Sequence, residues 1–181
     1  MLGTSLEVGG WSLVLFEYIF RMSDLTIRPL RDNAEARDCA ARLMEFGPWR
    51  TVGIPAEKLF KDLINPQREV FVAELGQKIS GVLILHLGGS FDGYIQLLAV
   101  FPEFQNRRLG EKIMGFAEEK IFQRSKNVFL SVSSFNPRAQ NFYERLEYKK
   151  FGELENFLVA GKNEILMRKT KGPLLDFSPQ P

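Results

Sequence analysis

Hydrophobic and polar positions alternate along the chain with two different periods, which predict helices and strands in turn. Apolar residues three or four positions apart indicate helices, and short apolar runs rich in β-branched and aromatic residues indicate strands. We expect helices at residues 33–46, 55–64, 109–122 and 137–146. We expect strands at residues 25–30, 69–75, 78–87, 94–101, 128–133, 148–154 and 164–169.

The order of these elements indicates the fold class. Strand and helix signals follow one another without repeats or low-complexity linkers, which is typical of one α/β domain built in layers. The pattern predicts a mixed central sheet of about seven strands flanked by about four helices. We expect the sheet to be mostly antiparallel, as in the α+β type, and to become parallel around the two late helices.

Glycine and proline residues mark several of the boundaries. Gly47 and Pro48 are predicted to end the first helix, because neither residue favours its continuation. Pro55 stands at a helix-opening position before the second helix. Gly76 and Gln77 separate two β-rich runs and predict a hairpin.

The two ends of the chain differ from this pattern. Residues 11–20 are mostly apolar, but they make only about half of a membrane span, and no basic residue precedes them as a signal peptide requires. We therefore expect residues 1–21 to be a leader upstream of a native start at Met22, the alternative being an added element that packs on the domain. The domain is predicted to span residues 22–171, and the proline-rich tail at 172–181 to be irregular.

Composition excludes several functional classes. The chain has 181 residues, 45% of them hydrophobic, and its net charge of +2 comes without the basic block that a nucleic-acid interface needs. Cys39 is the only cysteine and His86 the only histidine, so neither a disulfide framework nor a metal cluster is expected. We expect Cys39 to pack in the core, His86 to end a strand, and the protein to be cytoplasmic, without a membrane or nucleic-acid partner.

The segment from Leu97 to Gly110 carries the first chemical signal. It reads as a strand, a short polar loop and the start of an amphipathic helix, which brings free backbone N–H groups and the positive end of a helix dipole to one point. Arg107 and Arg108 add positive charge, and Gly110 lets the backbone approach a bulky anion. The segment predicts a phosphate site, although many such turns are merely solvated.

This segment resembles the coenzyme A pyrophosphate loop of the GNAT family of N-acetyltransferases, with the pattern Gln/Arg-x-x-Gly-x-Gly/Ala. Gln105 and Gly110 match its outer positions, and Arg108 replaces its first glycine. In the family, the preceding strand splays from its neighbour and its backbone binds the pantetheine arm. The resemblance implies cofactor-binding roles for Leu98, Ala99, Val100, Gln105, Asn106, Arg107, Arg108, Leu109, Gly110, Glu111 and Asn136.

A second motif lies at residues 136–148. The residues alone predict a helix capped by Asn136, with Tyr143 in its buried stripe. The segment also resembles the family's Asn-x-x-Ala-x-x-(Phe/Leu)-Tyr-x-x-x-Gly-(Phe/Tyr) element, in which the tyrosine points at the coenzyme sulfur and the asparagine contacts the coenzyme arm. The resemblance thus implies that Tyr143 is catalytic, and Glu147 replaces the motif's glycine.

The resemblance covers about residues 25–169 and implies the GNAT fold. It implies an N-acetyltransferase that moves an acetyl group from acetyl-coenzyme A, without a metal, to a primary amine of a small molecule or protein in a ternary complex. The ribosomal-protein N-terminal acetyltransferases look similar, and several of them carry a general-base glutamate on the fifth strand, where this chain has Ser131. Either a monomer or a homodimer is expected.

The implied mechanism has three parts. The Val100 N–H would polarise the thioester carbonyl, and Tyr143 would protonate the sulfur. A water held by Gln96, Tyr94 or Ser131 would relay the proton of the amine.

Two alternatives stay open at this point. Trp49, Arg50 and the helix at residues 56–63 would border the acceptor groove or would simply be packing residues. The rival function is a non-catalytic coenzyme A-binding or regulatory module of the same fold, which Arg108, Glu147 and Ser131 favour because they depart from the family pattern.

Overall fold

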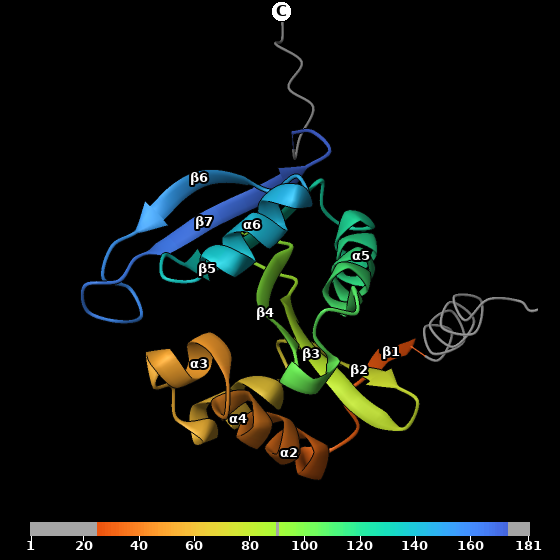
Figure 1. Cartoon of the computed structure of the whole chain (residues 1–181). Helices are drawn as coiled ribbons and strands as arrows, with labels where there is room; N and C mark the ends of the chain where they lie inside the picture. Colours follow the sequence, from red (N-terminus) through yellow and green to blue (C-terminus); the bar gives the residue numbers. More distant parts are fainter. Residues whose placement is uncertain (1–24, 90, 174–181) are drawn as a thin grey trace, which may run out of the picture.

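The computed structural model describes residues 25–89 and 91–173 (Figure 1). The strands in this part are β1 (Leu25–Pro29), β2 (Glu69–Leu75), β3 (Lys78–His86), β4 (Tyr94–Val100), β5 (Asn127–Ser133), β6 (Lys149–Leu154) and β7 (Glu164–Thr170). The helices are α2 (Asn33–Met44), α3 (Gly47–Val52), α4 (Ala56–Leu63), α5 (Leu109–Phe122) and α6 (Pro137–Arg145), with a short 3₁₀ turn η1 (Pro102–Phe104). The expectations for residues 1–21 and for most of the tail lie outside the described residues.

All seven strands form one sheet in the order β1-β2-β3-β4-β5-β7-β6. Every neighbouring pair is antiparallel except β4 and β5, which run parallel. The prediction of a mixed, mostly antiparallel sheet is therefore confirmed. The parallel pair arises because α5 carries the chain back between the two strands, as a crossover connection must.

Helix α3 was not predicted from the sequence. The first helix was expected to run to residue 46, but α2 ends at Met44 with Glu45 as its C-cap, and Phe46 is already extended. Gly47, with a left-handed φ of 62°, is the first residue of α3. Pro48 then stands in the first turn of a new helix, where its missing N–H costs no hydrogen bond. The chain thus leaves α2 two residues before Gly47 and Pro48, which begin the next helix.

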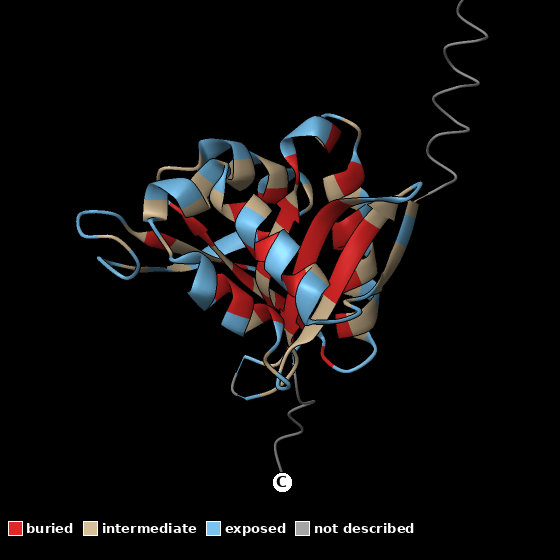
Figure 2. Ribbon diagram, turned by 90° about the horizontal axis from the view of Figure 1, so that it is seen from below, coloured by how far each residue is buried: buried red, intermediate tan, exposed pale blue. Residues whose placement is uncertain are grey.

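The sheet carries helices on both faces, and each face has its own apolar core. Leu43 and Ile84 belong to the cluster between the sheet and helices α2 and α4. Ile113 and Leu130 belong to the cluster between the sheet and helices α5 and α6. Figure 2 shows buried residues along the central strands and on the inner sides of the helices. Cys39 is fully buried in the first cluster, as expected, and burial raises the pKa of its thiol to about 12.

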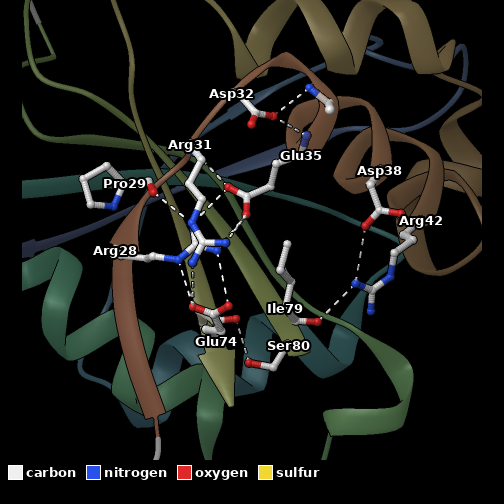
Figure 3. A network of polar contacts seen from close by, with 12 residues as sticks. Arg28, Pro29, Arg31, Asp32, Glu35, Asp38, Arg42, Glu74, Ile79 and Ser80 are labelled. Atoms are coloured by element: carbon white, nitrogen blue, oxygen red, sulfur yellow. Dashed lines mark hydrogen bonds and ion pairs between the residues drawn. The ribbon is translucent and has the colours of Figure 1, made fainter. Parts of the chain in front are cut away.

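An ion-pair network fixes the first strand to the first helix (Figure 3). The guanidinium of Arg28 on β1 lies 2.7 Å from Glu35 of α2 and 2.8 Å from Glu74 of β2. Asp32 caps α2 by accepting hydrogen bonds from two backbone N–H groups at 2.9 Å. The network holds α2 against the sheet edge, and none of its charged residues lines the large cavity described below, so we assign it a structural role.

The sheet divides between β4 and β5. Only two residue pairs, Tyr94 with Phe129 and Ile95 with Leu130, join the strands. The register of β4 against β3 shifts at this point, which leaves Gln96 as the extra residue of a bulge. Beyond the bulge, β4 continues with β3 and β5 continues with β7, so a fork opens in the middle of the sheet.

Candidate active site

A cavity of about 1460 Å³ occupies the fork. Its wall combines β4, β5 and the start of β7 with the N-terminal ends of α5 and α6, and α3 and α4 close one side. Cavities that bind drug-sized ligands are typically about 300–1,000 Å³. This one has room for a long cosubstrate and a second molecule.

The free edge of β4 faces the fork. The N–H of Phe101 donates to the carbonyl of Ser80 at 2.9 Å, which directs Phe101 toward β3. Because successive residues of a strand direct their backbone groups to opposite edges, Leu98 and Val100 direct theirs into the fork and Ala99 toward β3. An extended ligand arm can therefore hydrogen-bond to β4 as an added strand would.

The loop between η1 and α5 has the backbone conformation of an anion site. Asn106 and Arg108 have positive φ angles of 61° and 57°, and Arg108 is the N-cap of α5. As the first helical residues, Leu109, Gly110 and Glu111 have N–H groups without a partner inside the helix. Arg108 also forms an exposed ion pair with Glu111 at 2.8 Å, which solvent screens.

Side chains fix this loop to its neighbours. The amide nitrogen of Gln105 donates to the carbonyl of Val100 at 3.0 Å, and its oxygen accepts from Arg138 at 3.1 Å. Arg138, in the first turn of α6, also donates to the side-chain oxygen of Asn106 at 2.9 Å. One residue of α6 therefore orders the loop before α5. Arg107 differs from the other predicted cofactor-binding residues: it lies over the ring of Phe104 and is absent from the cavity wall.

Gly110 brings the two helices together. A Cβ atom at this position would lie 3.3 Å from the ring of Phe142, closer than most such contacts. Glycine therefore allows the start of α5 to pack directly on α6. Asn136 caps α6 by accepting from the N–H of Ala139 at 3.2 Å, as its position predicted, and it also lines the cavity.

Tyr143 enters the fork from α6. Its ring packs edge-on against Phe142 and Tyr148, with centroids 5.3 Å and 5.9 Å away. Burial raises the pKa of Tyr143 to about 12, and the nearby Tyr94 adds to the rise. The phenol is therefore protonated at neutral pH and can donate a proton. Tyr143 is buried, as the core interpretation predicted, and it also lines the cavity, while its catalytic role stays a prediction.

Two of the three predicted relay residues meet at the base of the fork. The hydroxyl of Tyr94 lies 3.0 Å from the hydroxyl of Ser131, which bridges β4 and β5 just where their pairing ends. Gln96 also lines the cavity, from the bulge.

Glu164 is the polar residue of this site that sequence reasoning missed. It begins β7, lies directly opposite Ser133 of β5 and is only 4% exposed. The hydroxyl of Ser133 donates to its carboxylate at 2.6 Å. The sequence does carry a signal for Glu164: a glutamate is the first residue of the apolar strand β7, and serine alternates with apolar residues in its partner β5. The pairing of β5 with β7 was needed to connect them.

The other side of the cavity is more apolar. Trp49 of α3 and Lys58 and Asp62 of α4 line it, as the sequence suggested, whereas Arg50 is exposed and lies outside the wall. The loop between β6 and β7 adds Phe157 and Leu158, which are 61% and 48% exposed. Figure 1 shows this loop on the side of the molecule where α3 lies.

Comparison with known proteins decides which family has this arrangement. The sequence profile described as the acetyltransferase (GNAT) family matches residues 33–148, more than half of the chain. The chain belongs to the GNAT acetyltransferase family. It is therefore an acyltransferase, and acetyl-coenzyme A is its cosubstrate. A search of curated proteins found no match.

Solved acetyltransferase structures share the fold at low identity. An acetyltransferase from Thermus thermophilus is similar with a TM-score of 0.64 at 20% identity, covering 81% of this chain and 96% of that one. Spermidine N-acetyltransferase from Vibrio cholerae, in complex with CoA and spermine, has a TM-score of 0.62 at 19% identity over 82% and 96%. Aminoglycoside 6'-N-acetyltransferase from Enterococcus faecium has a TM-score of 0.61 at 20% identity over 83% and 99%.

This GNAT chain keeps glycine-like backbone geometry at both positions where it lacks the glycine of the family motifs. Arg108 has a φ of 57° and Glu147 a φ of 70°. Both departures therefore change side-chain chemistry and leave the path of the backbone as a glycine would have it. Arg108 and Glu147 therefore no longer favour a non-catalytic module, and of the three departures only Ser131 still does.

Two further properties of the GNAT chain concern only its described residues. Between residues 25 and 173, with residue 90 left aside, no group of three or more His, Cys, Asp or Glu side chains could hold a metal ion. In the same part of the chain, no helix is both long and apolar enough to cross a membrane.

Proposed function

We propose that this protein transfers the acetyl group of acetyl-coenzyme A to a primary amine, directly, with both substrates bound at once. The observation that carries the proposal is the convergence of three features on one cavity: the free edge of β4, the helix start after Arg108 and the phenol of Tyr143. The acceptor is a small molecule or the amine of a peptide or protein. The solved relatives named above include proteins whose names specify amine substrates.

Residues of this chain can carry out each step of the proposed transfer. The N–H groups at the start of α5 bind the pyrophosphate, and the fork-facing edge of β4 binds the pantetheine arm. The Val100 N–H polarises the thioester carbonyl, so that negative charge on its oxygen is stabilised as the amine attacks. Tyr143 protonates the sulfur as the carbon–sulfur bond breaks. Holding both reactants in one cavity supplies much of the rate increase.

The similarity to ribosomal-protein N-terminal acetyltransferases stays a prediction, as does the oligomeric state. We also keep the cytoplasm as the proposed compartment, because the only cysteine in the sequence is Cys39 and its thiol is buried in the core.

Two measurements test the proposed function. Purified protein, acetyl-coenzyme A and a panel of primary amines should release free thiol and yield acetylated amine by mass spectrometry. Reciprocal plots of rate against each substrate should intersect, as direct transfer requires. Tight binding of coenzyme A without thiol release for any amine would instead support the non-catalytic module.

The coenzyme loop is tested by two variants at one position. Gly110→Pro and Gly110→Ala both add carbon atoms next to Phe142, but only the proline removes a backbone donor. We expect Gly110→Pro to weaken coenzyme A binding about tenfold more than Gly110→Ala, which corresponds to about 1.4 kcal/mol. Equal affinities for the two folded variants would place the pyrophosphate elsewhere.

A further inference from the structure

The carboxyl group of Glu164 is buried in the cavity wall without a cation. Among residues 25–89 and 91–173, no basic side chain lies within ion-pair distance of it. Burial of a carboxylate is costly unless an opposite charge compensates it. Uncompensated carboxylates in clefts are candidates for a functional role, and a positively charged ligand is the compensation that this site lacks.

A row of hydroxyl groups lies between Glu164 and the base of the fork. Its carboxylate accepts from Ser133 at 2.6 Å, and Ser131 lies two residues away on the same face of β5, where its hydroxyl lowers the pKa of Glu164. The hydroxyl of Ser131 also lies 3.0 Å from the hydroxyl of Tyr94, and either group can donate to the other. Because a carboxylate can only accept, a proton that reaches Glu164 along this row of hydroxyls passes from Tyr94 through Ser131.

These residues lie on one face of the sheet. Tyr94 pairs with Phe129 and Glu164 with Ser133, and side chains two positions apart on a strand share a face. Val132 and Met167, from the alternate positions, belong instead to the core under α5 and α6. The relay thus opens on the side of the cavity that α3 and α4 cover, whereas Tyr143 enters from the side of α6.

The charge around Glu164 suits a general base. Burial raises its pKa, and the hydroxyls of Ser133 and Ser131 partly offset that rise. Burial also raises the pKa of Tyr94, so its phenol is protonated at neutral pH. The other charged side chains that line the cavity are Lys58, Asp62, Arg108, Glu111, Arg138 and Arg145. Lys58 and Asp62 pair with each other at 3.3 Å, which leaves Glu164 as the one buried carboxylate in the described wall.

The cavity wall around Glu164 limits which chemical groups the acceptor can carry besides its ammonium group. Trp49, Ile54, Phe157 and Leu158 present apolar surface to the same side of the cavity. A polycation would need several carboxylates there, whereas the described wall offers one unpaired carboxylate among apolar groups.

We propose that the acceptor is a primary ammonium on an apolar body, and that Glu164 takes its proton through the hydroxyls of Ser131 and Tyr94. This rests on the proposed function and adds its proton acceptor and the class of its second substrate. The acceptor is a free monoamine or the N-terminus of a peptide with an apolar first residue, since both present the same group.

The step balances as follows. One ammonium proton passes to the oxygen of Tyr94 while the phenol proton passes to Ser131 and the serine proton to Glu164. The freed lone pair forms the carbon–nitrogen bond, and the carbon–sulfur bond breaks with its electron pair going to sulfur, which Tyr143 protonates. A second proton then passes from the nitrogen to the oxygen of Tyr143, which is a phenol again. The carboxyl group of Glu164 later releases the proton that it took up to solvent. The products are amide, thiol and one proton.

The decisive variant is Glu164→Gln, measured by the pH dependence of kcat/KM with 2-phenylethylamine. At neutral pH we expect kcat/KM to fall roughly 10²- to 10⁴-fold, the usual contribution of a general base. The loss should shrink as the pH approaches the pKa of the amine, because neutral amine needs no base. Coenzyme A affinity and melting temperature should stay near those of the parent.

Controls separate this role from a structural one. Glu119→Gln makes the same charge change on an exposed part of α5 and should leave the profile unchanged. Ser131→Ala leaves the carboxylate in place but breaks the relay, and it should show the same pH-dependent loss even if Glu164→Gln folds poorly. Two outcomes would overturn the inference: a loss of kcat/KM that is the same at every pH, or no loss in either Glu164→Gln or Ser131→Ala. If the parent still acetylates amines, the proposed function stays intact in both cases.

The acceptor class is tested with three amines. We expect 2-phenylethylamine or a peptide with N-terminal leucine to exceed spermidine in kcat/KM by at least roughly tenfold, because spermidine would bring uncompensated charge into the apolar side. Preference between the first two distinguishes a free amine from a peptide. Preference for spermidine would overturn the proposed acceptor class. No thiol release with any amine would overturn the proposed function and this inference together.

Discussion

The backbone N–H of Tyr148 donates to the carbonyl of Tyr143 at 3.0 Å, and this bond closes α6 around a left-handed residue, Glu147. The N–H of Glu147 donates to the carbonyl of Glu144 at 2.9 Å, which completes a Schellman motif. The rings of Tyr143 and Tyr148 are in contact across the same turn. The turn that ends the helix therefore also holds the candidate catalytic ring in place.

Glycine should fit this turn better than any other residue. We expect Glu147→Gly to be more stable than Glu147→Ala by about 1 kcal/mol, because a side chain in the left-handed conformation is strained and glycine is not. Chemical denaturation of the two variants measures the difference, and neither carries the charge of the parent. Equal free energies of unfolding would mean that the positive φ at this position costs nothing.

Arg138 is predicted to support coenzyme binding by ordering the loop before α5. Arg138→Met removes its hydrogen bonds to Gln105 and Asn106 and should weaken coenzyme A binding about tenfold. Arg168→Met makes the same charge change at an exposed position of β7 and serves as the control in a calorimetric titration. A similar small loss of coenzyme A affinity in both variants would mean that Arg138 acts only through long-range attraction between charges.

Tyr143→Phe tests the proton donor of the proposed mechanism. The change removes one hydroxyl and keeps the ring that Phe142 and Tyr148 contact. A positioned proton donor should contribute roughly 10²-fold or more to the rate, whereas a structural hydroxyl would contribute about 1 kcal/mol of stability. Single-turnover rates and melting temperatures should be measured on the same sample. A stable variant with the parent's chemical rate would leave Tyr143 as a core aromatic.

The Arg28 network is predicted to make stability depend on acid. Arg28 lowers the pKa values of Glu35 and Glu74 in the folded protein. Carboxylates of this kind have a pKa of about 4.3 when unfolded, so their contribution is complete above that value and is lost as the pH falls through the lower folded pKa. Arg28→Met should cost about 1–3 kcal/mol at neutral pH and flatten the decline in unfolding free energy below about pH 4.3.

The neighbouring arginine provides the control for this prediction. Arg31 is 61% exposed and lies 3.7–4.0 Å from the same two carboxylates. Arg31→Met should therefore cost less than about 1 kcal/mol. Equal losses for the two variants would show that net charge, and not the partly buried, short-distance geometry of Arg28, sets the effect.

Local signals predicted most of the secondary structure and the coenzyme loop. Helix α5, with the loop before it, and the cap of α6 at Asn136 depend on residues within a few positions of one another, and such signals survive in the sequence. Reliance on local signals also explains why helix α3 was missed. Gly47 and Pro48 together are a strong local signal for the end of a helix, and the helix that they begin is short. The contact of Arg138 with Gln105 joins residues 33 positions apart and left no local signal.

The sequence by itself determined the order of strands and helices, the loop proposed to bind phosphate and the place of the tyrosine on α6, because backbone conformation and capping follow from neighbouring residues. Only the tertiary structure decided which side chains line the side of the cavity that we propose for the acceptor. Strand β7 inserts between β5 and β6, and this order brings Glu164 beside Ser133, 31 positions away. Pairing between strands distant in the chain depends on which edges can be buried together, and that is a property of the whole sheet.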